Sequence, residues 1–338
     1  MSDGFNLMLG GLVALVAALG TALLTWAIHP LLVRYALARP NARSSHKVPT
    51  PQGAGIAVVA VTLAVAAFAI LTTNNAETHL VFMTFGATIL LAIVGAVDDL
   101  RTIAVLPRLL LQAAAVIIVV AALPDSVRAM PQLPLLAERA MVFVAGLWLV
   151  NLVNFMDGID WIMVAEVVPI AAALVLLCVA GEVSPRVGIV AAALGGAMIG
   201  FAPFNKPVAK VFLGDVGSLP IGLLLGWCLL ALAWHGHLAA ALLLPLYFLT
   251  DATATLLRRM WRREPFWDAH RSHFYQRATD NGFTVQRIVG EIFVLNVLLA
   301  ALAGLSVTIN AASMDVAALV AGLCATSLLL YRFSRPKS

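Results

Sequence analysis

Long apolar runs separated by short polar segments dominate this chain. A helix needs about 20 mainly apolar residues to cross a lipid bilayer. Backbone groups find no water to bond inside the hydrocarbon, so runs of this length form α-helices. The pattern therefore predicts an all-α, polytopic integral membrane protein with about eleven transmembrane helices. Their expected positions are roughly 5–28, 53–72, 79–97, 105–123, 140–156, 161–180, 186–203, 216–233, 238–257, 284–308 and 314–331.

The composition supports this fold class. Of the 338 residues, 62% are hydrophobic and 11% are charged, whereas a soluble domain carries about 25% charged residues. Cys178, Cys228 and Cys324 lie in apolar runs without paired spacing, which indicates packing rather than a disulfide framework or a zinc site. The start, MSDGFN, has no basic residue and predicts an uncleaved first span. We expect a single transmembrane domain over residues 1–338, without a soluble domain.

Lysine and arginine predict the orientation. With eleven spans, 18 of the 21 basic residues fall in one set of alternate loops. Only Arg128, Arg139 and Arg186 fall in the other set. The positive-inside rule makes the first set cytoplasmic, which places the N-terminus outside and the C-terminus inside.

Polar clusters gather in the predicted cytoplasmic loops, at about 29–52, 98–104, 151–160, 204–218 and 258–283. The clusters are SSHKVPTPQGAG (44–55), VDDL (97–100), NLVNFMDGIDW (151–161), KVFLGDVGS (210–218) and DAHRSHFYQRA (268–278). The outer loops carry nothing comparable, so we expect one polar site on the cytoplasmic face.

Asp98 and Asp99 end the third predicted span. They could simply face headgroups, but acids at a membrane edge are functional candidates by default. A divalent cation or a basic residue would compensate their charge. Ligand sets made only of oxygen favour Mg²⁺ or Mn²⁺ over zinc.

The segment 151–161 places polar residues three apart. This spacing keeps Asn151, Asn154 and Asp157 on one side of a helix. Gly158 is expected to end that helix, so that Asp157 and Asp160 point into a shared site. Hydrogen bonding between helices would explain the asparagines alone, but it explains the two acids poorly.

Two further loops offer groups for phosphate binding. Asp215 lies between Gly214 and Gly217, and glycines let the backbone approach a ligand closely. Lys47 is followed by prolines that would fix its position or merely end a helix.

His270 and His273, at i and i+3, could face one ligand and hold a diphosphate together with Arg271. They make a poor zinc site. The arginines that precede them are also explained by binding to anionic lipid.

Acids for Mg²⁺ and basic groups for phosphates together indicate phosphoryl transfer. The sequence contains neither a P-loop nor G-x-G-x-x-G, so a nucleotide would have to bind the membrane domain itself. In these motifs and in their order, this chain resembles the polyprenyl-phosphate N-acetylhexosamine-1-phosphate transferases of glycosyltransferase family 4, the MraY/WecA-like enzymes. The resemblance extends over residues 44–278 and rests on the PTP-and-glycine loop, the Asp-Asp pair, N-x-x-N-F-x-D-G-x-D, F-x-G-D-x-G-S and the H-x-x-H loop.

The resemblance implies transfer of N-acetylhexosamine 1-phosphate from a UDP-sugar to undecaprenyl phosphate, with release of UMP. The segment AHRSHFYQR is similar to the corresponding loop of the enzymes that start O-antigen and other surface polysaccharides. It is less similar to that of the peptidoglycan branch, whose loop has consecutive histidines. It also implies a multi-pass protein of the bacterial inner membrane, with the active site facing the cytoplasm. We expect no nucleic-acid partner, and a homodimer is left open.

Residue roles follow from the same resemblance. The expected catalytic residues are Asp98, Asp99 and Asp215. The expected ligands for Mg²⁺, or Mn²⁺, are Asp215, Asp157 and Asp99. The expected substrate-binding residues are Lys47, Asn151, Asn154, Asp157, Asp160, His270, Arg271 and His273, with the histidine loop on the diphosphate and sugar.

One departure from the family pattern is Trp161, where the family usually has glycine after D-G-x-D. Its indole could narrow the sugar or uracil pocket, or anchor the sixth span at the interface. The donor sugar stays open, as does the choice between direct attack and a covalent aspartyl intermediate.

Three other functions share parts of this pattern. A transporter or flippase of lipid-linked sugars could use membrane acids and histidines as a relay, but its site would lie near the midplane. A peptidoglycan-precursor transferase of the MraY type would share the chemistry. The CDP-alcohol phosphotransferases also contain an Asp-Gly element, but their motif continues differently from DGIDWIMVAE.

Overall fold

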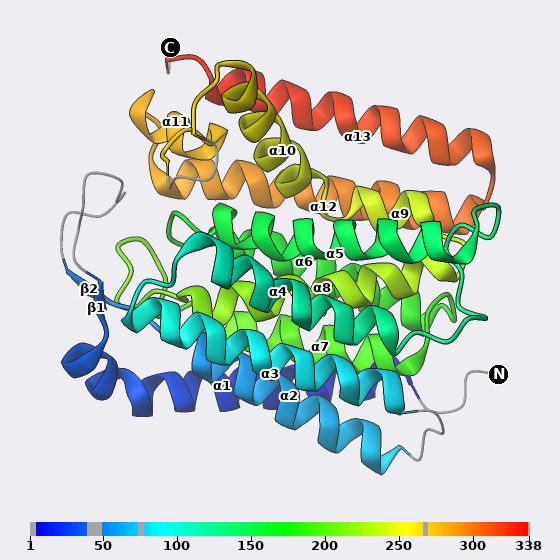
Figure 1. Cartoon of the computed structure of the whole chain (residues 1–338), viewed down its shortest axis with the longest axis horizontal. Helices are drawn as coiled ribbons and strands as arrows, with labels where there is room; N and C mark the ends of the chain where they lie inside the picture. The colour runs from blue at the N-terminus through cyan, green and yellow to red at the C-terminus, as the bar shows by residue number, and fades with distance from the viewer. Residues whose placement is uncertain (1–4, 39–48, 74–77, 266–269, 337–338) are drawn as a thin grey trace.

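The structure is a computed structural model that describes residues 5–38, 49–73, 78–265 and 270–336. In this part of the chain the long helices run side by side in one bundle (Figure 1). The helices are α1 (Leu7–Tyr35), α2 (Gly55–Thr72), α3 (His79–Leu100), α4 (Val105–Ala121), α5 (Leu135–Met156), α6 (Ile162–Val179), α7 (Pro185–Phe201), α8 (Asp215–Trp234), α9 (Leu238–Leu243), α10 (Leu246–Trp261), α11 (Phe274–Asp280), α12 (Val285–Ile309) and α13 (Ala312–Phe333). The predicted all-α class is confirmed.

Eight of the described helices are long and apolar enough to cross a membrane. They are α1, α2, α3, α5, α6, α8, α12 and α13, and the shorter α4 and α7 are also apolar. The chain is therefore a polytopic membrane protein. Ten of the eleven predicted spans each coincide with one helix, although α1 continues past residue 28 to Tyr35.

The prediction of a single span over 238–257 is wrong. This segment forms two helices, α9 and α10, which are separated at Leu244 and Pro245. A proline has no N–H to give to the helix and its ring crowds the preceding turn. The chain changes direction here, and α10 slopes away from the bundle (Figure 1).

Helix α8 lies inside the bundle, packed against α2, α3 and α5. Nearly all of its residues from Val216 onward are buried. Its first turn is tightly covered, because a Cβ atom on Gly95 of α3 would lie 2.3 Å from the backbone of Asp215. Glycine at this position allows the end of α3 to contact the start of α8.

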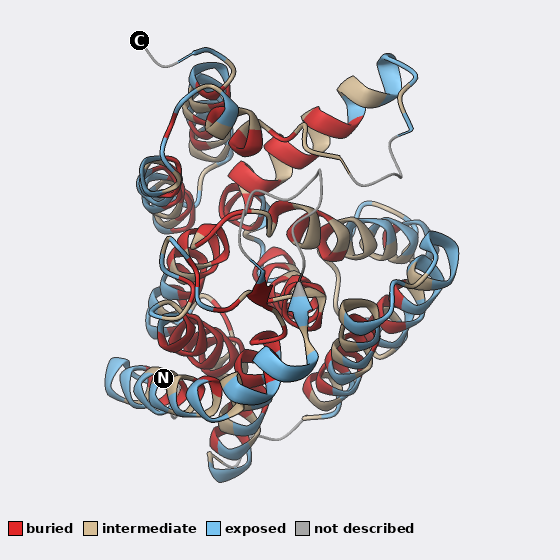
Figure 2. Cartoon of the chain, turned by 90° about the vertical axis from the view of Figure 1, so that its left-hand side faces the viewer, coloured by how far each residue is buried: buried red, intermediate tan, exposed pale blue. Residues whose placement is uncertain are grey.

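The polar segments collect at one end of the bundle. Strands β1 (Leu37–Ala38) and β2 (Thr50–Pro51) form an antiparallel pair there, near the starts of α4, α6 and α8 and near α11 (Figure 1). The N-terminal part of the chain begins at the opposite end, and the C-terminus returns to this one. Figure 2 views this end directly, with buried segments surrounding its centre.

Candidate active site

The segment after β2 joins the polar end of α3 to the start of α8. Gly55 N–H donates to the Leu213 carbonyl at 2.8 Å, and Phe212 N–H donates to the Pro51 carbonyl at 2.8 Å. Gln52 Nε2 donates to the Asp99 carbonyl at 2.8 Å. These bonds bring three distant motifs of the chain together. Lys47 lies outside the described residues.

Asp98 and Asp99 have different partners. Asp99 accepts the N–H groups of Asp215 at 2.9 Å and Val216 at 3.1 Å, so it caps the start of α8. Asp98 instead accepts the Ile103 N–H at 2.5 Å and an N–H of Arg108 at 2.7 Å. Both acids are fixed within the site, and Asp99 also holds the backbone of Asp215 in place.

Arg108 is a site residue that the sequence reasoning counted only as a loop charge. Its Nη1 lies 2.7 Å from Asp98 Oδ2 and 3.8 Å from Asp215 Oδ2. It sits near the start of the apolar helix α4, ten residues after Asp98. A single arginine at the edge of an apolar helix, shortly after paired acids, was the available signal.

Asn154 connects α5 to α8. Its Nδ2 donates to Asp215 Oδ1 at 2.8 Å and lies 2.9 Å from Ser218 Oγ. Asn151 donates to the Leu147 carbonyl of its own helix at 2.8 Å. Asn154 therefore orients the Asp215 carboxylate. Asn151 lies about one turn before Asn154 in α5.

Asp157 follows the last residue of α5. Burial, together with the charges of Asp99 and Asp160, raises the pKa of its carboxyl to about 7. Among the described residues, its carboxylate has no hydrogen-bond donor. Asp157 is thus close to other acids and poorly compensated.

Asp160 is turned toward the loop before α8. It is 4% exposed, and its Oδ2 accepts the Ala209 N–H at 2.9 Å. The expected shared site of Asp157 and Asp160 is therefore only partly formed, because one of the two carboxylates binds backbone.

Trp161 has a left-handed backbone, with φ of 65°. Its N–H donates to Asn205 Oδ1 at 2.7 Å, and its indole Nε1 donates to the Ala202 carbonyl at 2.6 Å. Left-handed φ favours glycine, which gives a conformational reason for the glycine usual in the resembled family.

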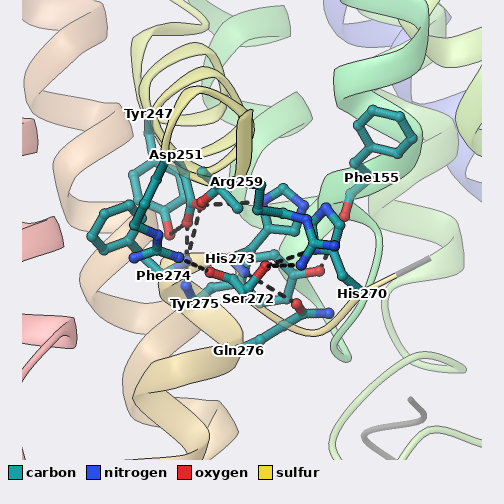
Figure 3. Close-up of polar contacts among 12 residues, drawn as sticks. Phe155, Tyr247, Asp251, Arg259, His270, Ser272, His273, Phe274, Tyr275 and Gln276 are labelled. Atoms are coloured by element: carbon teal, nitrogen blue, oxygen red, sulfur yellow. Dashed lines mark hydrogen bonds and ion pairs between the residues drawn. The ribbon is translucent and has the colours of Figure 1, made fainter. Parts of the chain in front are cut away.

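The histidine loop is anchored by Asp251, a fully buried residue of α10 that the sequence reasoning missed. Its Oδ1 lies 3.2 Å from His273 Nδ1 and accepts the Phe274 N–H at 3.0 Å. Its Oδ2 accepts the Tyr275 N–H at 3.2 Å. Figure 3 shows His273 between Asp251 and His270. An acid inside a predicted apolar span was the missed signal.

His270 lies beside His273, with 4.9 Å between the ring centroids. Its Nδ1 is 2.9 Å from Ser272 Oγ. Burial, together with the neighbouring His273, Arg259 and Arg258, lowers the pKa of His270 to about 4. The ring is therefore neutral near pH 7.

Arg271 does not join the two histidines. Its Nη2 donates to Thr279 Oγ1 at 3.0 Å and lies 3.2 Å from Asp280 Oδ1. The guanidinium is thereby directed along α11. Both contacts use Nη2, so other N–H groups of the guanidinium are left for the predicted contact with a diphosphate.

Tyr275 packs the histidine loop against the segment 151–161. Its hydroxyl donates to the Phe155 carbonyl at 3.1 Å. A Cβ atom on Gly158 would lie 2.1 Å from that hydroxyl oxygen. Glycine at 158 therefore permits the contact between two motifs that are more than 100 residues apart.

A cavity of about 560 Å³ lies among α4, α5, α10 and the histidine loop. One part of its wall is apolar and contains Leu109, Val144, Leu147, Trp148 and Leu256. Its polar lining contains Arg108, Asn151, Asn154, Asp215, His270 and His273. The cavity therefore suits a ligand with a phosphate group and a long apolar part. Trp161 is absent from the lining.

The described residues contain no ready-made group of three His, Cys, Asp or Glu that could hold a metal ion. The chemistry of the donors still fits a hard cation. Carboxylates of Asp99, Asp157 and Asp215 are oxygen ligands of the kind that Mg²⁺ prefers. The raised pKa of Asp157 also reflects negative charge that a divalent cation would relieve.

Comparison with known proteins agrees with this site. A sequence model described as Glycosyl transferase family 4 matches residues 81–233, which include the acid pair, the segment 151–161 and Asp215. The chain is similar to this family over these residues. The glycosyl transferase family 4 match does not include the segment before α2 or the histidine loop, which the structure brings to the same place.

The chain is also similar in sequence to individual transferases whose names state a polyprenyl phosphate or a transferred phospho-sugar group. The chain is 27% identical over 305 residues to a probable undecaprenyl-phosphate N-acetylglucosaminyl 1-phosphate transferase of Bacillus subtilis, covering 84% of this chain and 81% of the relative. It is 29% identical over 237 residues to a decaprenyl-phosphate N-acetylglucosaminephosphotransferase of Mycolicibacterium smegmatis, covering 64% and 58%. A phospho-N-acetylmuramoyl-pentapeptide-transferase of Limosilactobacillus fermentum is 34% identical over 115 residues, covering 33% and 34%.

Proposed function

We propose that this protein transfers a sugar 1-phosphate from a nucleotide sugar to a polyprenyl phosphate. The observation that carries the proposal is the cavity whose apolar wall leads to Arg108, Asp215 and His273. A polyprenyl chain would lie along the apolar wall, and its phosphate would lie at the polar lining. The names of the relatives, which act on undecaprenyl and decaprenyl phosphate, support this acceptor class.

The reaction is an exchange at one phosphorus. An oxygen of the lipid phosphate forms a bond to the sugar-linked phosphorus of a UDP-N-acetylhexosamine. The bond from that phosphorus to the bridging oxygen breaks, and UMP leaves with the electron pair. The acceptor phosphate needs no strong base, because a phosphomonoester is largely ionised at neutral pH.

The residues of the polar lining have separable roles in this proposal. Arg108 holds the lipid phosphate while its partners Asp98 and Asp215 keep the guanidinium in place. Asp251 assigns the hydrogen of a neutral His273 to Nδ1, which leaves Nε2 as the nitrogen available to substrate. Asp215, Asp157 and Asp99 would hold Mg²⁺, or Mn²⁺, which neutralises diphosphate charge when bound.

The cellular setting follows from the same proposal. A multi-pass position in the bacterial inner membrane, with the site facing the cytoplasm, agrees with the distribution of Lys and Arg. Undecaprenyl phosphate would be the acceptor in that membrane. Spacing of the histidines favours the branch that begins O-antigen or other surface polysaccharides. Because relatives of the peptidoglycan-precursor type also match, the donor must be identified directly.

The test is transfer of radiolabel from UDP-sugars into an organic-extractable lipid. Membranes containing the protein would be incubated with undecaprenyl phosphate and, separately, UDP-GlcNAc, UDP-GalNAc and UDP-MurNAc-pentapeptide. We expect label from one of the first two donors and none without added lipid phosphate. Transport of label without a new diphosphate bond would instead support a flippase.

Asp215→Asn is the matching variant. We expect it to lower turnover by about 100-fold or more, because one carboxylate that positions charge in the reaction is lost. Excess EDTA should remove activity, and added Mg²⁺ should restore it. An unchanged melting temperature would show that the variant remains folded, and full activity in EDTA would contradict the metal assignment.

A further inference from the structure

The end of α10 is unlike the rest of the helix. Its first half is buried, whereas Leu257, Met260 and Trp261 are exposed, and Trp261 is 90% exposed. Figure 2 shows this end projecting from the bundle at the upper right, and in Figure 1 it lies at the top of the molecule, in front of the end of α13. An exposed tryptophan here is typical of a side chain at a membrane surface.

Four arginines lie at this end of α10 or directly after it, and they fall into two groups of two. Arg258 donates to the Ser272 carbonyl at 2.6 Å, and Arg259 lies 2.8 Å from Glu264 Oε2. These two hold the segment that leads to the histidines. Arg262 and Arg263 are exposed, and within the described residues neither side chain has a hydrogen bond or an ion pair.

We propose that the end of α10, from Leu257 to Arg263, is a docking surface for anionic phospholipid headgroups. The apolar side chains and Trp261 enter the bilayer interface, and Arg262 and Arg263 contact the phosphates. A positive charge beside an interfacial aromatic residue is complementary to the negative cytoplasmic leaflet.

Docking at this surface would also position the substrate cavity. Leu256, one residue before the surface, belongs to the cavity wall. Asp251 lies on the same helix and holds His273, while Thr253 accepts the Trp148 indole N–H at 3.2 Å. An anionic membrane thus steadies the helix that carries one side of the site. This consequence rests on the proposed function, whereas the lipid contact does not.

The lipid contact is tested by fluorescence quenching in the full-length protein. Vesicles of phosphatidylcholine would contain a small fraction of brominated phosphatidylglycerol or, in parallel, brominated phosphatidylcholine. The difference between the wild-type protein and Trp261→Phe gives the signal of Trp261. We expect stronger quenching by the anionic lipid, because the arginines concentrate it near the indole.

The double variant Arg262→Gln/Arg263→Gln should lose this preference and keep quenching by brominated phosphatidylcholine. Arg34→Gln is the matched control, because Arg34 is an exposed arginine in the last turn of α1, and α1 ends at the polar end of the bundle (Figure 1). It should keep the preference. Equal quenching by both lipids in the wild-type protein, or a preference that survives in the double variant, would overturn the proposal.

Transfer activity tests the positioning. We expect the wild-type rate to rise with the phosphatidylglycerol content of the vesicles and the rate of the double variant to stay flat. A parallel rise in both proteins would contradict the positioning while leaving the lipid contact to the quenching result. If no donor is transferred in any vesicle, the proposed function fails, and the quenching still decides the docking surface.

Discussion

At the scale of single residues, the acids of the site take their hydrogen-bond donors from distant parts of the chain. Asp98, Asp99 and Asp160 were recognisable as acids near a membrane edge. Their geometry depends on backbone N–H groups far along the chain, such as that of Ala209 for Asp160. No periodic pattern contains such a pairing. Arg108 was missed for the same reason, because its charge already fitted the orientation rule.

Trp161 gives a test of backbone conformation. At φ of 65°, a residue with a Cβ atom costs about 1 kcal/mol more than glycine. We predict that Trp161→Gly is more stable than Trp161→Ala by about 1 kcal/mol, because both lose the indole contact but only alanine keeps the strain. Thermal unfolding of the two variants in the same lipid would measure the difference.

The same two variants test the role in donor choice. Since Trp161 is absent from the lining of the described cavity, we expect the ranking of UDP-sugars to match the wild-type ranking in both. A reversed ranking would show that the indole shapes the donor site by a route outside this cavity.

His270 gives a test of pH dependence. The neighbouring charges are those of His273, Arg258, Arg259 and Asp251, and burial is the main cause that lowers the pKa of His270 to about 4. The unfolded chain binds more protons than the folded one between about pH 4 and 6.5. The contribution to stability is therefore complete above pH 6.5 and is lost as the pH falls toward 4.

We predict that His270→Gln flattens this acid loss of stability, because glutamine does not titrate. At pH 6.5 to 8, His270→Gln should keep more activity than His270→Ala, since it retains a polar amide without a charge that the wild-type ring also lacks. Melting temperatures from pH 4.5 to 8 would check the first part. An identical acid limb in the wild type and in His270→Gln would contradict it.

At the scale of helices, hydrophobicity predicted where a helix lies better than it predicted whether that helix is interrupted. Pro30, Pro169 and Pro220 remain inside helices, whereas Pro245 separates α9 from α10. The sequence alone could not distinguish these prolines, because the outcome depends on which neighbours satisfy the freed backbone groups. At the start of α10, one such neighbour is Glu166 of α6, which accepts the Phe248 N–H.

Glu166 joins three helices inside the membrane. Its Oε2 accepts the Asn296 Nδ2 group of α12 at 2.6 Å, and both residues are 1% exposed. Glu166 Oε1 and Asn296 Oδ1 are both buried acceptors without a partner. A charged carboxylate is costly in hydrocarbon. We therefore expect Glu166 to be a neutral carboxylic acid.

We predict that Glu166→Gln keeps the wild-type stability, because its amide also offers one acceptor and a donor. Glu166→Leu should lose about 2 to 4 kcal/mol, since Phe248 N–H would lose its acceptor and the Asn296 amide would keep only its bond to the Ala165 carbonyl. Unfolding in a fixed detergent or lipid would compare the three proteins. A leucine variant as stable as the wild type would contradict the role of this contact in holding the start of α10.

At the scale of the whole molecule, the alternation of spans and loops predicted the most. Five motifs spread from residue 44 to 278 were expected at one end of the helices, and their described parts meet there through Gln52, Asp99, Asn154 and Tyr275. This success has a simple physical cause. A helix that crosses a bilayer returns the next loop to the opposite side, so counting spans also sorts the loops. Counting spans could not predict the cavity, because its shape depends on the direction in which α10 leaves the bundle.

The shared cavity sets the last prediction, which separates acceptor from donor. Val144→Trp adds bulk to an apolar wall position, so the KM for undecaprenyl phosphate should rise while the KM for the UDP-sugar stays near its wild-type value. His273→Gln should instead lower kcat/KM for the UDP-sugar by about 100-fold, because an oriented ring nitrogen is lost from the polar lining.

Paired kinetics, with each substrate varied while the other is saturating, would decide these assignments. His273→Gln should leave the lipid KM nearly unchanged, since the apolar wall that holds the chain is intact. Phe155→Leu, on the same lining, keeps an apolar side chain and serves as the control for small changes in cavity shape. A selective rise of the lipid KM in His273→Gln, with donor kinetics intact, would show that the histidine loop holds the acceptor phosphate. The polar lining would then serve one substrate, and the donor would have to bind closer to Asp157 and the loop held by Asp160.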